Sequence, residues 1–436
     1  MYFVILVFST HSRIFPAKRR VNLADAPIFG YNADRMRIQT QSEAKEQMKI
    51  AGVIAEYNPF HLGHAYHLRE TRARTGCDYV VACMTGSFTQ RGEAACASKW
   101  ARTRAALNCG ADAVFELPAL FAVRTADAFA RGGVAILAGV GCDVLSFGCE
   151  TGDLAIISRL AELRANEPEC LSAAIRDGLA AGRSHARARG EALAEMLSLP
   201  PESLNAPNLI LAAEYLRAMR EQASGMQPVA IERRGDYRSD ALSGLASAGA
   251  IRSAVRRGDP RAADHLPPEA QFQLRGAGEM HEMDDLLLFR LREMGAGGIA
   301  ALPDAGEGLD ARVYAAALRS GSRAELVERV KCKRYTYARI SRLCAHALLG
   351  LTAQLAQRHP LPEYARLLGL RAGAAPLMRE IKARASLPLA PGAAMLRGNE
   401  IFDLECRATD LRALLCGQRE ERCAGQEFTQ KFVRVP

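Results

Sequence analysis

The chain has 436 residues, 49% of them apolar, a formal net charge of +9 and 12 cysteines. This length is sufficient for two domains, and no apolar run is long enough to cross a membrane. The cysteines stand singly with no C-x-x-C pair, which argues against a disulfide framework or a zinc knuckle, and the positive charge suits a nucleic-acid partner without requiring one.

Residues 1–47 show no coherent pattern. The apolar stretch at 2–8 has neither a basic leader nor a clean cleavage site, so we do not expect export. The scattered cysteines agree with reduced thiols, and we predict a cytoplasmic protein. Met48 leads directly into an apolar run. We therefore expect Met48 to be the initiator and residues 1–47 to be a wrongly assigned or disordered extension.

The apolar run 50–55 predicts a buried strand, and Pro59 then interrupts regular structure. A helix beginning near Gly63 directs free N–H groups and its positive end at an anion. His61 and His64, in a His-x-Gly-His pattern, share one face of its first turn. Two imidazoles there can donate hydrogen bonds to an α-phosphate as charge builds up during a displacement.

Other interpretations of the two histidines remain open. The same spacing is compatible with a zinc site or with satisfied core positions. A metal site is disfavoured because no cysteine or carboxylate pair completes it, so we expect no protein-bound metal. The glycine-rich phosphate loops G-x-G-x-x-G and G-x-x-x-x-G-K-[ST] are absent from this position.

Further apolar strands are predicted at 79–84, 113–117 and 144–147, with helices at about 98–108 and 125–138 between them. Ser98 is a plausible N-cap and Gly110 a helix stop. Apolar strands that alternate with helices predict an α/β fold with a Rossmann-like, doubly wound parallel sheet. The polar motifs follow the strand ends, which is where such sheets bind ligands.

Several side chains near these strand ends have two interpretations each. Arg91 can pair with a phosphate or a carboxylate, or belong to an ordinary polar loop. Lys99 and Arg102 can contact phosphates or form a solvated helix face. Glu116 lies inside an apolar strand and requires a partner if it is buried.

The second half of the chain is mainly helical by its pattern. Helices are expected over 153–225, where Asn208 can read a base or ribose edge or cap a helix. A strand at 228–232 places Arg233 for phosphate contact or for the surface. We expect a catalytic domain at 48–245 and a mainly helical domain at 246–436, with a loop or linker at 295–309.

A basic run with interleaved aromatics lies at 329–342. Its cations can neutralise backbone phosphates while its tyrosines stack on exposed bases, although a solvated helix with inward tyrosines is the alternative. The residues expected to bind RNA are Lys331, Lys333, Arg334, Tyr335, Tyr337 and Arg339. His281, His346 and His359 have no companions that indicate catalysis, and we interpret them as structural.

These motifs together resemble a known family. They are Gly52-Val-Ile-Ala-Glu-Tyr-Asn-Pro-Phe-His-x-Gly-His64, Gly86-x-Phe-x-Gln-Arg-Gly-Glu93, Lys99-Trp-x-Arg102, Gly110-Ala-Asp112, Glu116-Leu-Pro118, Phe147-Gly-x-Glu150, Pro207-Asn208, Ser247-Ala-x-x-Ile-Arg252 and Lys333-Arg-Tyr-Thr-Tyr337. The set is similar to bacterial tRNA(Met) cytidine acetate ligase, within the HIGH-motif nucleotidyltransferase superfamily. It extends over essentially the whole chain from Met48.

The resemblance implies a two-step reaction. Acetate attacks the α-phosphate of ATP to give acetyl-adenylate and pyrophosphate, and the acetyl group then passes to N4 of the wobble cytidine of elongator tRNA-Met. ATP is the implied co-substrate, with Mg²⁺ expected beside it, and no membrane partner is implied. The implied catalytic residues are His61, His64 and Arg91. The implied ATP contacts are Ile54, Ala55, Glu56, Tyr57, Asn58, Pro59, Phe60, His61, Leu62, Gly63, His64, Ala65, Tyr66, His67, Gly148, Asn208 and Arg233.

The sequence departs from the family pattern at three places. Leu209 stands where a second asparagine is usual, and a shorter loop makes Arg233 and Arg234 compete for the ATP contact. The mobile lysine loop of the superfamily is not visible. Two alternatives to the ligase therefore stay open: an adenylyltransferase that acts on a small phosphorylated cofactor precursor, and a non-catalytic, nucleotide-dependent RNA-binding protein.

Overall fold

The computed structural model describes residues 48–183, 185–200, 203–204, 206–222, 224–233, 242, 244–277 and 280–436. The expectations for residues 1–47 and for Arg234 lie outside the described residues. Residues 48–436 group into one unit by their mutual contacts. Among the described helices, none combines the length and the apolar character that a bilayer crossing requires.

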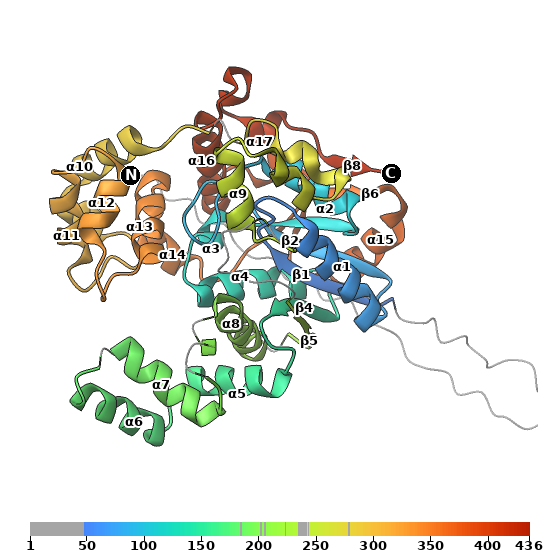
Figure 1. Cartoon of the computed structure of the whole chain (residues 1–436). Helices are drawn as coiled ribbons and strands as arrows, with labels where there is room; N and C mark the ends of the chain where they lie inside the picture. The colour runs from blue at the N-terminus through green and yellow to red at the C-terminus, as the bar shows by residue number, and fades with distance from the viewer. Residues whose placement is uncertain are drawn as a thin grey trace, which may run out of the picture. The chain divides into compact units, whose positions relative to one another are not determined.

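One mixed sheet organises this unit (Figure 1). Its strand order is β5-β4-β1-β2-β3-β6-β7, and β8 also pairs with β6. Strands β1 to β5 are parallel, whereas β6 runs antiparallel to β3. The strands are β1 (Ile50–Ala55), β2 (Tyr79–Thr85), β3 (Ala113–Leu117), β4 (Val144–Cys149), β5 (Gln227–Glu232), β6 (Ala365–Arg371), β7 (Leu389–Ala390) and β8 (Val433–Val435).

Helices connect and cover these strands. In the first half they are α1 (Leu62–Thr75), α2 (Lys99–Asn108), α3 (Ala119–Ala122), α4 (Ala126–Gly139), α5 (Leu154–Ala165), α6 (Glu169–Ala180), α7 (His185–Leu197) and α8 (Pro207–Glu221). In the second half they are α9 (Ala248–Arg256), α10 (Asp284–Ala300), α11 (Leu309–Ala317), α12 (Arg323–Val330), α13 (Tyr337–Leu349), α14 (Ala353–Arg358), α15 (Ala375–Arg384), α16 (Glu400–Leu414) and α17 (Gln426–Thr429). Short 3-10 turns are η2 (Pro260–His265), η3 (Pro268–Leu274), η5 (Ala372–Ala374), η6 (Ala393–Leu396) and η7 (Arg419–Arg422).

The central strands are apolar at nearly every position because both faces of the sheet are covered. Alternate residues of β2 enter different cores: Val81 and Cys83 join the core that contains α4 and α8, and Val80 and Ala82 join the core beneath α1 and α2. This is the period of two that a strand imposes on its side chains. A continuous apolar run is therefore what a doubly covered strand requires.

The structure confirms the α/β class and the five predicted parallel strands, with boundaries that agree to within two residues. Ser98 is the N-cap of α2, and its side chain accepts a hydrogen bond from Ala101 N. The order of the strands reverses between β1 and β4. Strands β2 and β3 lie on one side of β1, and β4 and β5 lie on the other. That reversal point is where open α/β sheets bind ligands, at the carboxyl ends of the strands.

Two expectations for the second half require correction. Residues 246–436 do not leave the sheet, because β6 pairs with β3 and β8 pairs with β6, so the division expected at residue 246 does not coincide with a break in the sheet. The segment 295–309 is not loop throughout, since α10 continues to Ala300 through a kink at Gly295, whose φ of 64° glycine tolerates.

The second half also has cores of its own. Helices α10 to α13 enclose one, built around residues such as Leu291, Val313 and Leu343. A smaller core joins α9 to η2. Figure 1 shows α10 to α13 gathered on one side of the sheet. Arg252 on α9 bonds to Asn58 O in the loop that follows β1. The second half therefore supplies a helical bundle, α10 to α13, and also the helix α9, which contacts the loop at the end of β1.

Candidate functional site

The helix that follows β1 begins at a pair of stacked histidines. His61 is the N-cap of α1, and its Nδ1 accepts a hydrogen bond from Gly63 N at 3.0 Å. The Nδ1 of His64 accepts one from His61 N at 3.2 Å, which completes a capping box made of two imidazoles. The rings stack with centroids 3.8 Å apart. A side chain at Gly63 would clash with the His61 ring, so the glycine is required by this close approach.

These hydrogen bonds select the tautomer of each histidine. An Nδ1 that accepts a backbone N–H carries no proton, so in the neutral ring the proton resides on Nε2. Both rings therefore present an Nε2–H donor. A pair of adjacent N–H donors at a helix N-terminus is a suitable arrangement for phosphate oxygens.

The surroundings keep these imidazoles neutral. Burial, followed by the charges of Arg233, Arg252 and His265, lowers the pKa of His61 to about 3. Burial and then the neighbouring His61, Arg233 and His67 hold the pKa of His64 well below its usual value. At neutral pH the pair therefore donates hydrogen bonds without contributing a charge.

A third histidine lies one turn further along α1. The Nε2 of His67 is 3.2 Å from the hydroxyl of Ser146 on β4, and that hydroxyl is 2.7 Å from the hydroxyl of Thr71. Burial and then Arg233 lower the pKa of His67 to about 4. His67 is thus bonded to the neighbouring strand and joins α1 to β4.

The ends of β4 and β5 add a cation and an amide to this site. Arg233 follows β5, and a Cβ placed on Gly148 would lie 3.4 Å from its Cγ, so this arginine passes directly over the end of β4. Its charge acts on the pKa of all three histidines. Asn208 Nδ2 donates to Glu150 Oε1 at 2.6 Å, while Ala206 rather than Asn208 is the N-cap of α8. The structure thus brings these sequence-predicted residues to the carboxyl ends of β4 and β5.

The loop after β1 is fastened to the loop after β2. Glu56 Oε1 accepts a hydrogen bond from Gln90 N at 2.7 Å, and burial is the main cause that raises the pKa of Glu56. Arg102 Nη1 donates to the carbonyls of Glu56, at 2.7 Å, and Thr85, at 3.0 Å. The guanidinium of Arg102 is buried and bonded to backbone carbonyls. Arg102 is therefore not free to bind a phosphate, and it is not part of a solvated helix face. Arg91 is exposed on the turn that follows Gln90, close enough for its charge to act on Glu56.

The side chains of the predicted run 54–67 divide between site and core. Tyr57 and Phe60 are buried in the core beneath α1 and α2, so their side chains pack rather than line an opening. Tyr57 has a φ of 51°, an unusual conformation for a bulky residue, at the point where the chain turns from β1 towards α1. Of the remaining positions, Ile54, Ala55, Leu62, Gly63 and Ala65 are partly exposed around the histidines, whereas Tyr66 is buried.

Residues from beyond position 245 complete the wall of this site. Arg252 on α9 donates through Nη1 to Asn58 O at 2.8 Å and pairs through Nη2 with Glu93 at 3.3 Å. Gln273 accepts a hydrogen bond from Phe60 N at 3.2 Å. Sequence reasoning assigned no role to these residues. Arg252 lies in the Ser247-Ala-x-x-Ile-Arg252 motif, which was the available signal for it, whereas nothing in the sequence marked Gln273.

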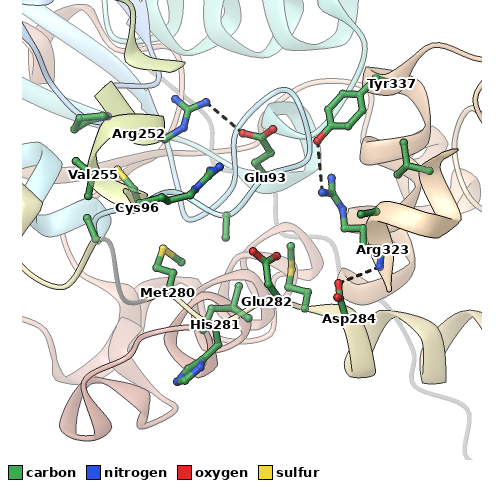
Figure 2. Close-up of a pocket in the computed structure, with 18 of the residues that line it drawn as sticks. Glu93, Cys96, Arg252, Val255, Met280, His281, Glu282, Asp284, Arg323 and Tyr337 are labelled. Atoms are coloured by element: carbon green, nitrogen blue, oxygen red, sulfur yellow. Dashed lines mark hydrogen bonds and ion pairs between the residues drawn. The ribbon is translucent and has the colours of Figure 1, made fainter. Parts of the chain in front are cut away.

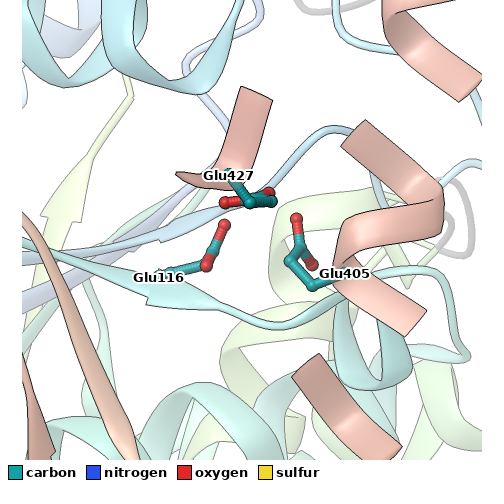
Figure 3. Close-up of side chains that lie close together, drawn as sticks. All are labelled: Glu116, Glu405 and Glu427. Carbon is teal, nitrogen blue, oxygen red and sulfur yellow. The ribbon is translucent and has the colours of Figure 1, made fainter. Parts of the chain in front are cut away.

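A buried ionic cluster lies behind the loop that follows β2 (Figure 3). Glu116, Glu405 and Glu427 surround the ammonium of Lys99, and Arg366 Nη1 pairs with Glu116 at 2.9 Å. Burial disfavours the charge of Lys99, but these carboxylates outweigh it and raise the lysine pKa. The ammonium takes the place a metal ion would need between the three carboxylates. Lys99 is therefore neither a solvated helix residue nor a phosphate contact, and Glu116 has the partners that its burial requires.

The predicted RNA-binding residues fall into two groups. Lys331, Lys333, Arg334 and Tyr337 are exposed. Tyr335 is buried, and its hydroxyl donates to Glu307 O, so it is unavailable for stacking on a base. Arg339 bonds to Asp304 O at 3.0 Å and pairs with Glu307 at 2.8 Å, which makes it a structural link between α13 and the loop between α10 and α11.

The three isolated histidines lie away from the stacked pair. His346 is buried, and its Nε2 is hydrogen-bonded to Val123 O. The ring of His359 is hydrogen-bonded to Glu363 and Glu400. His281 bonds through its backbone N–H to Leu415 O, and its side chain is exposed. The bonds of His346 and His359 agree with the structural interpretation of these two residues.

Comparison with known proteins places this geometry in context. The model of the family described as HIGH Nucleotidyl Transferase matches residues 48–427. The tRNA(Met) cytidine acetate ligase of Acetivibrio thermocellus is 34% identical over 419 residues, covering 88% of this chain and 100% of the relative. That of Caldanaerobacter subterraneus is 35% identical over 384 residues, covering 84% and 95%.

Solved structures are similar over the same region. The crystal structure of Thermotoga maritima TmcAL bound with alpha-thio ATP matches with a TM-score of 0.80 and 30% identity, covering 89% of this chain and 99% of that one. The apo form of the same protein matches with a TM-score of 0.82 and 30% identity. One of these neighbours therefore holds an ATP analogue on the same fold.

Proposed function

The chain belongs to the HIGH nucleotidyl transferase family, and from that membership we propose that it is an ATP-dependent ligase that activates acetate and passes the acetyl group to a cytidine of tRNA(Met). The observation that carries the proposal is the stacked pair His61 and His64, with two Nε2–H donors at the start of α1 and Arg233 close by. Relatives named as tRNA(Met) cytidine acetate ligases support the choice of acetate and of the RNA.

In the first step an acetate oxygen attacks the α-phosphorus of ATP, a phosphorus–oxygen bond breaks and pyrophosphate leaves. Negative charge builds up on the α-phosphate oxygens. His61 and His64 donate to those oxygens, and because both rings are already neutral and fixed by backbone N–H groups, they do not need to reorient. Arg233 supplies positive charge on the same side, and Asn208 and Gly148 complete the ends of the strands around the nucleotide.

Mg²⁺ enters the proposal as the companion of the triphosphate, which is how this ion usually binds: mostly through phosphate oxygens and water with one or two carboxylates. Within the described residues, the one group of three acidic side chains close enough to share an ion is Glu116, Glu405 and Glu427. Lys99 already neutralises that group. The proposed ion would therefore be held mainly by the nucleotide.

In the second step the N4 amine of the wobble cytidine of elongator tRNA-Met attacks the acetyl carbonyl, the acyl–phosphate bond breaks, AMP leaves and the amine nitrogen loses one proton to the solvent. The exposed cations Lys331, Lys333 and Arg334 are proposed to neutralise phosphates of the RNA. Tyr337, which begins α13, is the exposed aromatic beside them.

ATP–pyrophosphate exchange, measured with and without acetate, tests the proposal. Exchange that depends on acetate and needs no RNA is the expected result. Exchange that requires a phosphorylated small molecule instead of acetate would identify an adenylyltransferase. RNA binding without any exchange would indicate a non-catalytic nucleotide-dependent RNA-binding protein.

A further inference from the structure

A pocket of about 740 Å³ lies between the loops at the strand ends and the helices α9, α12 and α13 (Figure 2). Its volume lies in the range that holds a small organic ligand or a single nucleoside. The first half of the chain contributes Pro59, Glu93 and Cys96, and the second half contributes Arg252, Arg323 and Tyr337. None of the three histidines on α1 lines it. The pocket is thus separate from the stacked pair, although the two sites share a wall.

That shared wall is built from two interactions of Arg252. One of its nitrogens donates to Asn58 O, directly before Pro59 in the segment that leads to His61, and the other pairs with Glu93 in the pocket. The charge of Arg252 also lowers the pKa of His61. A group bound beside Glu93 therefore lies next to the segment that carries the nucleotide-binding histidines.

The opposite wall presents an aromatic ring. The Tyr337 side chain begins α13 and stays 41% exposed, although it is a large apolar group. Arg323 lies over the ring, 5.8 Å from its centroid, and donates to the tyrosine hydroxyl at 3.5 Å and to Ser341 Oγ at 2.6 Å. Asp284 Oδ1 accepts a hydrogen bond from Arg323 N at 3.0 Å. The ring is therefore held in position by a fixed cation and remains accessible from the pocket.

Charges of both signs line the pocket, and the exposed acidic residues among them are Glu282 and Glu328. Arg256 and Lys331 line it and are exposed. Lys333 and Arg334 continue from Lys331 along the same exposed segment. A ligand attached to a phosphodiester backbone could thus place one base inside while its flanking phosphates stay outside against these side chains.

We propose that this pocket receives the acceptor base of the RNA substrate, a cytosine turned out of a single-stranded loop and stacked on Tyr337. Its exocyclic amine would donate to the carboxylate of Glu93, beside the segment that binds ATP. The proposal deepens the proposed function and rests on it. Enzymes that act on a base must bring it out of its stack, and aromatic side chains commonly receive it.

The chemistry of Glu93 makes the pocket selective. A carboxylate accepts hydrogen bonds from the N4 amine of cytosine, whereas uracil presents a carbonyl oxygen at the same position. A uracil oxygen facing Glu93 would be repelled. Figure 2 shows Glu93 with the Arg252 interaction on one side and Tyr337 across the pocket, so one base can meet both its stacking partner and its hydrogen-bond partner.

The first test separates stacking from the ATP half-reaction. Tyr337→Ala is compared with Tyr337→Phe, which keeps the ring, using an anticodon stem-loop RNA as acceptor. Stacking on an aromatic residue contributes about 1–3 kcal/mol per base, so kcat/KM for acetyl transfer should fall about 5- to 150-fold in the alanine variant. The phenylalanine variant should stay close to wild type. Acetate-dependent ATP–pyrophosphate exchange, measured without RNA, should be the same in all three proteins.

The second test measures base selectivity directly. Affinities of wild type and Glu93→Gln are compared for stem-loops that carry either cytidine or uridine at the acceptor position. The preference for cytidine should fall in the variant, because a carboxamide can also donate to the uracil oxygen. The ratio of the two affinities is the readout, so a general weakening of the site by loss of the Arg252 pair does not obscure it.

The results that would refute the proposed acceptor-base pocket differ from those that would refute the proposed ligase function. Equal loss of exchange and transfer in Tyr337→Ala would assign the pocket to the ATP half-reaction, and unchanged transfer would remove Tyr337 from the acceptor site. A wild-type protein without acetate-dependent exchange would refute the ligase instead. In that case a fluorescent cytosine analogue at the acceptor position still tests stacking, because its emission should be quenched by wild type and not by Tyr337→Ala.

Discussion

At the residue scale, the stacked histidines show how much of a site a short motif can specify. The His-x-Gly-His pattern correctly predicted two imidazoles on the first turn of a helix, and the structure adds that each Nδ1 is occupied by a backbone N–H. The sequence could not reveal Arg252 as a partner of Asn58, because that contact joins positions 194 residues apart. Local spacing predicts contacts within one turn of a helix, whereas contacts across the fold depend on packing.

Substitutions at His64 can distinguish the roles of its two ring nitrogens. Asparagine places a polar group near the position of Nδ1, and glutamine places one near Nε2. We expect His64→Gln to retain part of the ATP–pyrophosphate exchange and His64→Asn to lose it, because the lost transition-state donor is the Nε2–H. Removing one such donor typically costs about 10²- to 10³-fold in rate.

The RNA affinity of both His64 variants should stay close to that of wild type, since the exposed cations lie elsewhere. Exchange that survives better in His64→Asn would show that Nδ1, and hence helix capping, is the important function of this residue. Filter binding of the stem-loop RNA, measured in parallel with exchange, provides both readouts.

The lowered pKa values of the histidines predict a particular acid sensitivity. His61 and His67 titrate at about 3 and about 4 in the folded protein, whereas an unfolded histidine titrates near 6.5. Between these values the unfolded state binds protons that the folded state does not, so the free energy of unfolding should fall as the pH is lowered from 6.5 towards 4.

Denaturant unfolding at a series of pH values measures this effect. The loss of stability below pH 6.5 should be shallower in His67→Gln than in wild type. The difference between the two proteins at pH 7.5, where the histidines are neutral in both states, provides the reference. Parallel curves for the two proteins would mean that His67 is protonated in the folded state.

At the scale of elements, sequence patterns were reliable where a strand is followed closely by a helix and less so near the end of the chain. Strands β1 to β5 have short apolar runs between turn residues. Strand β6 is composed mainly of leucines and arginines, and both residue types favour helices by their own propensity. It becomes a strand because β3 offers it an unpaired edge. A strand that forms because of such a tertiary contact cannot be predicted from the local sequence pattern.

The buried ionic cluster joins five elements, α2, β3, β6, α16 and α17, and should contribute strongly to stability. Lys99 on α2 holds Glu116 on β3 and Glu405 on α16. Lys99→Met would leave buried carboxylates without their main counterion, which typically costs about 3–5 kcal/mol. The urea midpoint of unfolding measures this change.

An exposed ion pair supplies the matched control for the cluster. Arg176 and Glu169 form a pair on α6 with both side chains exposed, and such pairs contribute little to stability because water screens them. Arg176→Ala should therefore leave the urea midpoint almost unchanged. A Lys99→Met variant that is as stable as this control would show that the carboxylates take up protons and need no counterion.

At the scale of the whole molecule, the boundary expected near residue 246 separates segments that contact each other. Arg252 and Gln273 lie against the segment before α1, and β6 lies against β3. We expect a fragment of residues 48–245 to be unable to fold cooperatively by itself. The full chain should unfold in one transition, because its two halves share a sheet.

Circular dichroism during thermal unfolding compares the fragment with the full chain. A sigmoidal transition in the fragment, with a helical spectrum at low temperature, would restore the boundary as a true domain limit. Adding the remaining segment 246–436 in trans provides a further control, since reassociation of the two pieces should recover the helical signal if the interface between them is specific.

The pairing of β6 with β3 affects the risk of aggregation while the chain is being synthesised on the ribosome. About 250 further residues must be synthesised after β3 before its partner β6 emerges from the ribosome. At a synthesis rate of about 5–20 residues per second, this takes tens of seconds. During that time a strand that is apolar except for Glu116 exposes an open row of peptide groups, the kind of edge that recruits other chains. The nascent chain is therefore prone to aggregate at the same edge that later joins the two halves of the folded protein.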